Sequence, residues 1–342
     1  MEVYIDGNSN TSYYQPPSNV ITWQGICPTD DPKKYLLTGT QEGGVGAIYK
    51  GPINIANSND ILTMKYPDST TTSVYGPEIA NKKYTFVGSY QTGTPGISYP
   101  CKGFGYVGKC NDFSNKKNYF TIEPDTPSDF TVVHSTRGGL AVYISSDESQ
   151  LNFIIGKSFI FNINTKKTIA EVLYPDSVYT TTYGIWYNGK KNCNIHSYTI
   201  SGGFSLTGIL DTHTFVVDFL YNCKTGTYSF KNWTEIKIPG ISTYTHAQGI
   251  TKISKCEYIL PIANYHIDLL NPDKLSELSG GKIRIQRTKN GFELVSYQSI
   301  NFPQSLLTVV TSAAGKDAVV GVFENNNNEA SAFQATTKYC NN

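Results

Sequence analysis

Short apolar runs separated by polar turn residues recur along the whole chain. Most runs are four to six residues long, are rich in β-branched and aromatic side chains, and end at Gly, Asn, Asp or Pro. Runs of this length and composition predict β-strands, because a helix needs a longer stretch with apolar residues three or four positions apart. The first four runs lie near residues 20–26, 35–39, 46–49 and 61–64 and form one group.

A repeated string introduces each group of four runs. It consists of Pro, a few polar residues, Thr, two further residues and then an aromatic residue. The clearest copies are YPDSTTTSVYG at 66–76 and YPDSVYTTTYGI at 174–185. Copies follow one another at intervals of 49 to 65 residues, which suits a four-stranded unit with loop insertions. We assign the aromatic position to Trp23, Tyr75, His134, Tyr183, His246 and, in the last copy, Thr311.

This four-strand period resembles that of six-bladed β-propellers over essentially the whole chain. The resemblance implies an all-β fold in a single domain, 1–342, with four-stranded antiparallel blades near 18–67, 68–126, 127–175, 176–239, 240–303 and 304–342 plus 1–17. The last copy holds only three runs, so we expect an N-terminal strand, 3–5 or 12–15, to complete that blade and close the ring. The WD dipeptide, the kelch Gly-Gly pair and the sialidase Asp box are missing, so no named propeller family is matched.

The charge balance excludes two classes of partner. The 342 residues include 28 basic and 27 acidic ones, for a net charge of +1, so no field is expected that would attract nucleic acid. No run of about 18 apolar residues is present, which predicts a soluble protein without membrane insertion. The opening MEVYIDGNSNTS has no signal-peptide pattern. Compartment and oligomeric state stay open, while the Asn-, Ile-, Lys- and Tyr-rich composition resembles viral or microbial proteins from AT-rich genomes.

Cysteine and histidine spacing predicts no metal and no cofactor. The seven cysteines form no CxxC pair, and the five histidines form no HExxH motif. The glycines of 103–108 are similar to a dinucleotide-binding pattern, but no helix follows them. The odd cysteine count argues against a complete disulfide framework. Cys101 and Cys110 bracket a Gly-rich segment that we interpret as hairpin-like, which makes them candidates for one disulfide. The favoured alternative is that most of the cysteines are free, partly buried thiols.

The repeated aromatic position is the leading candidate for a binding site. In a propeller the first strand of each blade lines the central axis, so these residues are expected to ring one end of the channel. Aromatic faces and hydroxyl groups suit sugars or other flat polar ligands. The alternative is a ring that only packs between blades. The ligand-binding candidates are Trp23, Tyr75, His134, Arg137, Tyr183 and His246.

Two further features of the repeat have an expected role. His134 and Arg137 stand close together in the chain, so His134 is a candidate base and Arg137 a candidate anion clamp. The Thr three positions before the aromatic residue, as at Thr72 and Thr180, is expected to hold a turn or a neighbouring strand with its hydroxyl group. The Asp that follows Pro, as at Asp68, is expected to cap that turn.

These features favour a non-catalytic binding module that offers its channel mouth and rim loops to a glycan or a protein partner. One alternative is a hydrolase or lyase with an axial active site near His134 and His246. It would require a carboxylate converging on those histidines, and Asp68, Glu78 and Asp176 are the candidates. A second alternative is a virion or surface structural protein with exposed apolar patches.

Overall fold

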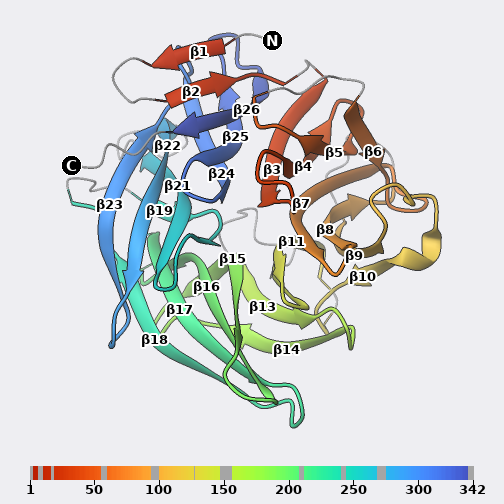
Figure 1. Cartoon of the computed structure of the whole chain (residues 1–342), viewed down its shortest axis with the longest axis vertical. Coiled ribbons are helices and arrows are strands. Elements are labelled where there is room, and N and C mark those ends of the chain that lie inside the picture. The colour runs from red at the N-terminus through yellow and green to blue at the C-terminus, as the bar shows by residue number, and fades with distance from the viewer. Residues whose placement is uncertain are drawn as a thin grey trace.

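The computed structural model describes residues 3–6, 11–16, 19–54, 60–93, 100–126, 128–146, 156–207, 212–239, 244–267 and 275–337, with the backbone alone for 3–6, 265–267 and 275–278. Almost every element in this part of the chain is a β-strand, and no helix there is long and apolar enough to cross a membrane. The sheets stand side by side around a common axis, so the chain is a β-propeller (Figure 1).

The strands come in successive antiparallel groups, each of which runs outward from the axis. In chain order they are β1 (Val3–Asp6), β2 (Thr11–Tyr14), β3 (Val20–Pro28), β4 (Tyr35–Gln41), β5 (Val45–Gly51), β6 (Ile61–Met64), β7 (Thr71–Ala80), β8 (Lys83–Gln91), β9 (Cys101–Gly108), β10 (Tyr119–Ile122), β11 (Phe130–Arg137), β12 (Leu140–Ser146), β13 (Lys157–Asn162), β14 (Lys167–Val172), β15 (Tyr179–Lys190), β16 (Ile195–Ser205), β17 (His213–Asn222), β18 (Tyr228–Ile236), β19 (Tyr244–Ala247), β20 (Thr251–Lys252), β21 (Glu257–Ile267), β22 (Leu275–Arg287), β23 (Phe292–Ile300), β24 (Leu307–Ala314), β25 (Ala318–Glu324) and β26 (Ala330–Thr337). A short 3-10 helix, η2 (Lys116–Asn118), precedes β10.

Hydrogen bonding links these groups into sheets of ten, eight, four and four strands within the described residues. The four-stranded sheets are β3–β6 and β15–β18. The eight-stranded sheet joins the group β7–β10 to the group β11–β14 through one parallel pair, Phe130 with Cys101. The ten-stranded sheet joins the groups that start at β19 and β24 through another, Leu278 with Leu307. We call β3, β7, β11, β15, β19 and β24 the inner strands, because each begins its group.

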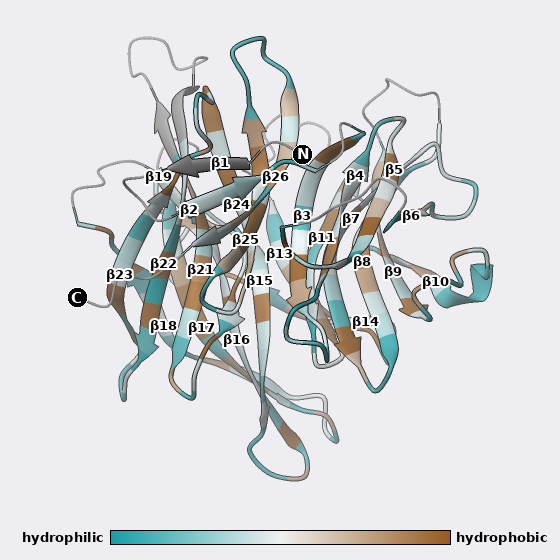
Figure 2. Ribbon diagram, turned by 45° about the horizontal axis from the view of Figure 1, so that its top comes forward, coloured by the Kyte–Doolittle hydropathy of each residue, from teal (hydrophilic) through white to brown (hydrophobic). Residues whose placement is uncertain are grey.

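Apolar residues on both faces of the sheets form the core, and each neighbouring sheet covers them. The largest cluster contains Ile160 and Val172 of one group and Ile200 and Phe215 of the next, all at most 1% exposed. Figure 2 shows apolar stretches along the strands and hydrophilic residues in many of the connecting loops. Because both faces are covered, strands in the middle of their groups, such as β12, β16 and β17, show nearly continuous burial rather than an alternating pattern.

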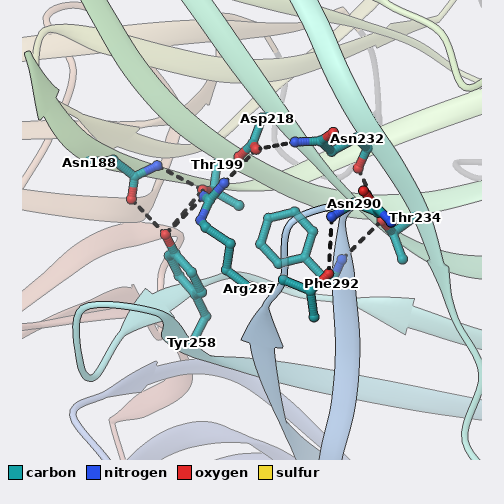
Figure 3. A network of polar contacts seen from close by, with 10 residues as sticks. Asn188, Thr199, Asp218, Asn232, Thr234, Tyr258, Arg287, Asn290 and Phe292 are labelled. Carbon is teal, nitrogen blue, oxygen red and sulfur yellow. Dashed lines mark hydrogen bonds and ion pairs between the residues drawn. The ribbon is translucent and has the colours of Figure 1, made fainter. Parts of the chain in front are cut away.

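A polar network centred on Arg287 at the end of β22 ties two neighbouring groups together (Figure 3). Its guanidinium forms an ion pair with Asp218 of β17 and donates to the hydroxyl groups of Thr199 at 2.8 Å and Tyr258 at 3.0 Å. Tyr258 in turn donates to the Asn188 side-chain oxygen at 2.7 Å. Asp218 is 7% exposed, so the ion pair replaces much of the hydration that its carboxylate loses on burial.

The Pro-containing string forms the same turn at three places. Tyr66, Tyr174 and Phe302 each accept a hydrogen bond from the backbone N–H three residues later, and the residue two positions on has a φ of 61–62°. Pro followed by a residue with positive φ is the signature of a type II turn. The aromatic ring of each turn stacks at 3.6–3.7 Å on a ring of the second strand of its group: Tyr90, Phe204 and Phe323.

The repeated Thr holds this turn through its hydroxyl group. The Thr180 oxygen accepts a 2.9 Å hydrogen bond from the Tyr174 N–H and lies 3.0 Å from the Ser177 oxygen. Thr72 and Thr308 make the same contacts in their own turns. The structural role expected for this Thr is therefore confirmed where the string is complete, and Thr243 lies outside the described residues.

Both candidate N-terminal strands are present. β2 pairs antiparallel with the last strand, β26, and β1 pairs with the outer edge of β2. Tyr13 of β2 is fully buried among Phe302, Phe323 and Phe333. The N-terminal segment thus contributes a core residue to the group that also contains the C-terminal strands.

The candidate disulfide between Cys101 and Cys110 is not formed, since both are free thiols, as the alternative interpretation has it. The Gly-rich segment between them is not a hairpin but the single strand β9. An extended strand rises about 3.3 Å per residue, so its two ends are far too distant for a disulfide.

Replacing Tyr13 by Ala should lower the free energy of unfolding by about 3–5 kcal/mol, because a large aromatic side chain leaves a buried cavity. Chemical denaturation measures this loss. Tyr14→Ala, on the half-exposed face of the same strand, is the matched control and should cost far less. Equal losses for the two variants would contradict the packing of β2 against β26.

Replacing Thr180 by Val should destabilise the protein by about 1–3 kcal/mol, because the Tyr174 N–H loses its acceptor with little change in shape. Thr225→Val in an exposed turn is the control, with an expected change within about 0.5 kcal/mol. The urea midpoints of the two variants decide the question, and a Thr180 variant as stable as the control would refute the turn's role.

Candidate ligand-binding site in the central channel

A β-bulge occurs at the same place in the inner strands. At this place the pairing of β3, β7, β11, β15 and β24 with the next strand skips one residue, and β3 and β15 each have one further skip elsewhere. In the group of β19 and β20, the break between these two strands lies at the corresponding place. A bulge leaves its extra residue out of the ladder and turns that side chain aside. The residues at this position, which we call the bulge ring, are Gln24, Tyr75, His134, Tyr183, Gln248 and Thr311.

The bulge ring surrounds a cavity of ≈ 240 Å³ on the axis of the propeller. All of its members line this cavity, and Val309 and Val322 of β24 and β25 complete the wall. Tyr75, His134 and Tyr183 keep part of their surface accessible although they lie deep in the protein, because that surface faces the cavity. Side chains from groups far apart in the sequence therefore converge on one small space.

A small residue follows every member of the bulge ring, either Gly or Ser. A Cβ atom at Gly25 would lie 1.8 Å from the Tyr75 carbonyl oxygen, and one at Gly184 would lie 2.7 Å from the Gly249 carbonyl carbon. At Gly25, Gly76 and Gly184 the neighbouring inner strand lies so close that no side chain larger than that of glycine fits. Each member of the bulge ring is thus followed by a residue small enough for the inner strands to lie close together.

Four aromatic side chains form a continuous stack along one side of the ring. The rings of Tyr75 and His134 meet edge to face with centroids 5.1 Å apart, and His134 lies flat on Tyr183 at 3.7 Å. Tyr183 then contacts His246 at 4.3 Å. Such packing fixes the direction of each ring, so the cavity wall is rigid on this side.

Burial keeps both histidines neutral near pH 7. It lowers the pKa of His134 from 6.5 to about 3, with a smaller contribution from the nearby His246, and it lowers the pKa of His246 to about 4. Burial also raises the pKa of Tyr75 to about 12. The cavity wall therefore carries no charge on these groups at neutral pH.

Hydrogen bonds occupy both ring nitrogens of His246. The Gln248 amide lies 3.3 Å from Nδ1 and the Thr181 hydroxyl lies 2.7 Å from Nε2. The Gln248 amide nitrogen can only donate, so Nδ1 accepts from it. His246 is not a member of the bulge ring and does not line the cavity. It instead orients Gln248, which does.

The structure places two of the predicted ring residues away from the cavity. Trp23 is fully buried between β3 and the strands of the last group, against Ala314 and Val320, and Gln24 takes its place on the ring. His246 lies behind the ring, and Gln248 takes its place. Tyr75, His134 and Tyr183 lie where the repeat predicts, as bulge residues on the cavity wall.

The small residue at the next position was the signal that could have corrected this alignment. Aligning the copies on the Gly or Ser after the bulge yields Gln24-Gly25, Tyr75-Gly76, His134-Ser135, Tyr183-Gly184, Gln248-Gly249 and Thr311-Ser312. Aligning on aromatic residues instead selects Trp23 and His246, because Gln24 and Gln248 are not aromatic and are passed over.

Arg137 lies on the far side of the bulge ring from Val309. It lines a second, smaller chamber of ≈ 30 Å³ that shares most of the bulge ring as one wall. Its guanidinium lies 5.0 Å from the centre of the Trp186 ring. Arg137 therefore does not line the larger cavity with His134, although the two residues are close in the chain.

No carboxylate lines the cavity wall in the described part of the chain. Glu78 accepts a hydrogen bond from the Gly138 N–H at 2.7 Å, and Asp68 pairs with Lys116 on the surface at 3.1 Å. Asp176 is exposed in its turn. Among the described residues no three His, Cys, Asp or Glu side chains are grouped so as to hold a metal ion.

The fold and the channel define the chain as a β-propeller. No protein-family model matches the sequence, and a comparison with curated protein sequences also found no match. The comparison of structures found similar folds at low sequence identity. A triple mutant of AofleA from Arthrobotrys oligospora has a TM-score of 0.47 and 10% identity, over 96% of this chain and 83% of that one.

Two further similar structures are a neuraminidase-like protein of A/flat-faced bat/Peru and the Aleuria aurantia lectin. The first has a TM-score of 0.49 and 8% identity, over 98% of this chain and 93% of that one. The second, described as a fungal lectin with a six-bladed β-propeller fold and a novel mode of fucose recognition, has a TM-score of 0.44 and 9% identity, over 93% of each chain. These likenesses carry no information on what this chain binds.

The free energy of unfolding should fall as the pH drops from about 6.5 towards 3. In this window His134 and His246 become protonated in the unfolded chain but stay neutral in the folded protein, because burial lowers their pKa values. His134→Phe keeps the stacking and removes one of these groups. The variant should therefore lose less stability over this window, by on the order of 1.4 kcal/mol for each unit of the lowered pKa.

Denaturation midpoints at a series of pH values test this expectation. His213→Gln is the control, since His213 is partly exposed and contacts Glu235 at 2.9 Å. A His134 variant with the same pH dependence as the wild type would show that His134 is not buried in its neutral form.

Proposed function

We propose that the chain is a non-catalytic binding module, a six-bladed propeller closed by β2, that takes one small uncharged polar molecule in the axial cavity. The blade count follows if the groups that begin at the inner strands each form one blade and the two parallel pairs are contacts between blades. The pairing of β2 with β26 then closes the ring within a single domain. The observation that carries the proposal is the convergence of the bulge ring on the axial cavity.

The chemistry of the wall supports an uncharged ligand. It offers the amides of Gln24 and Gln248, the tyrosine rings of Tyr75 and Tyr183 and the neutral ring of His134, and the described residues add no cation and no carboxylate to it. A buried charge without a partner costs several kcal/mol, so acidic or basic molecules are disfavoured. Amide groups and aromatic faces suit the hydroxyl groups and apolar faces of a sugar ring.

The size of the cavity supports a small ligand. Its ≈ 240 Å³ lies below the range of about 300–1,000 Å³ that is typical of sites for drug-sized molecules. A single neutral monosaccharide, or the end residue of a glycan that enters from the side of Val309 and Val322, is the class of ligand that fits both the volume and the wall.

An axial hydrolase or lyase receives less support. Such chemistry needs a group that gains and loses a proton near the working pH, commonly next to a carboxylate. The pKa of His134 is about 3 and that of His246 about 4, and both shifts come chiefly from burial. The hydrogen bonds that His246 makes with Thr181 and Gln248 leave neither of its ring nitrogens for a substrate.

A glycan array of neutral and acidic sugars, followed by calorimetry with the monosaccharides that bind, tests this proposal. We expect neutral sugars alone to bind and Tyr183→Ala to weaken binding at least tenfold, because it removes one wall of the cavity. Gln24→Ala is a second variant that spares the aromatic stack and should also weaken binding. Tyr187→Ala, on the same strand as Tyr183 but outside the cavity wall, should bind like the wild type.

Two outcomes would overturn the proposal. One is preferential binding of acidic sugars. The other is unchanged affinity in folded Tyr183→Ala and Gln24→Ala proteins, which would place the ligand elsewhere on the molecule.

A further inference from the structure

Pairs of lysines stand at hairpin turns in three neighbouring groups of strands. They are Lys82 and Lys83 where β7 turns into β8, Lys166 and Lys167 where β13 turns into β14, and Lys190 and Lys191 where β15 turns into β16. All six residues are exposed, and none forms an ion pair with an acidic residue in the described part of the chain. We call these six residues the lysine face.

Contacts around the turn between β11 and β12 show that the three lysine turns lie at the same end of the channel. Glu78, near the end of β7, accepts a hydrogen bond from the Gly138 N–H at 2.7 Å, and Tyr198 of β16 donates to the Gly138 carbonyl at 2.9 Å. The N–H of Ile163, in the turn between β13 and β14, donates to the Gly139 carbonyl at 3.0 Å. The lysine face therefore extends over three groups that are neighbours around the ring (Figure 1).

The segments at the other end of these groups are acidic. Residues 123–129 and 171–178, which lead into β11 and β15, include no basic residue and five acidic ones, Glu123, Asp125, Asp129, Glu171 and Asp176. Lys102 and Lys157, near the starts of β9 and β13 at this end, offset only part of that charge. Charges of opposite sign thus lie at opposite ends of the same strands, although the net charge of the chain is only +1. Such a distribution orients a protein in the field of a charged surface.

The chemistry of the lysine face favours a flat anionic surface as its partner. An ammonium group is a point charge on a flexible stem, whereas bidentate recognition of single phosphates is the role of arginine. Single-stranded nucleic acids are bound on stacking aromatic rings, and the turns 81–82, 163–166 and 191–194 include no aromatic residue. A plane of negative charges placed against this end of the molecule can attract all three turns at once.

We propose that the lysine face docks the protein on a membrane surface rich in anionic phospholipid, by electrostatic attraction and without insertion. Exposed lysines are attracted to the negative potential of such a surface, and salt screens the attraction.

This docking leaves the axial cavity accessible. Arg137 ends β11 at the lysine end of the channel, whereas Val309, on the opposite side of the bulge ring, lies near the start of β24. The side of Val309 and Val322 therefore faces away from the membrane. Docking does not depend on whether the cavity binds a sugar, because the lysine face takes no part in the cavity wall.

Sedimentation with lipid vesicles tests the proposal. We expect the protein to bind phosphatidylcholine vesicles that contain about one third phosphatidylserine, to be released as the salt rises from about 0.05 to about 0.5 M, and not to bind phosphatidylcholine alone. The double variant Lys190→Glu, Lys191→Glu should bind the anionic vesicles about tenfold more weakly or worse. Lys65→Glu, Lys157→Glu is the matched control, since it changes the net charge equally at exposed positions of the opposite end and should bind like the wild type.

Three results would overturn the proposal. One is the absence of binding to the anionic vesicles at low salt. Another is an equal loss of binding in the two double variants when their melting temperatures show that both are folded. The third is release of the protein from the vesicles by duplex DNA at a lower phosphate concentration than that of the anionic lipid, which would identify a nucleic acid as the preferred partner.

Discussion

The close approach of the inner strands at the axis is the constraint on which the rest of this structure depends. The Gly25 and Tyr75 backbones lie so near one another that a single added carbon atom would overlap a carbonyl oxygen. Strands this close leave no room for side chains between them, so each bulge turns its extra residue away from the contact. The same geometry requires a small residue after the bulge and directs the bulge-ring side chains before it into the axial cavity.

This constraint explains why the two spaces on the axis differ in chemistry. Side chains of the bulge ring line the larger cavity, and their amides, hydroxyls and rings are uncharged at neutral pH. The smaller chamber shares most of these side chains, and among the described residues Gly25, Gly76, Gly249 and the charged Arg137 also line it. Burial keeps His134 neutral near pH 7, because an imidazole can release its proton.

Side-chain contacts also connect neighbouring groups of strands, both near the axis and farther from it. Thr38 donates to the Tyr75 carbonyl at 2.6 Å and Ser201 donates to the Gly249 carbonyl at 3.1 Å, so hydroxyl groups satisfy backbone oxygens where one sheet meets the next. Further out, Arg287 and Asp218 join two sheets through a charged pair. Polar contacts between the sheets therefore fix the positions of the strands that carry the bulge ring.

The sequence by itself determined the repeating strands, the turn built on Pro, Ser and Thr, and the positions of Tyr75, His134 and Tyr183. Each of these follows from local rules: strand length, turn chemistry and a residue type that recurs at a regular interval. Only the tertiary structure decided that Gln24 and Gln248, rather than Trp23 and His246, face the cavity. It also decided that the extended strand β9 separates Cys101 from Cys110. A one-residue shift at a bulge moves a side chain from the cavity to the core, and that shift depends on how closely the strand approaches its neighbours. That approach is a contact between residues distant in the chain, so the pattern along any one strand does not contain it.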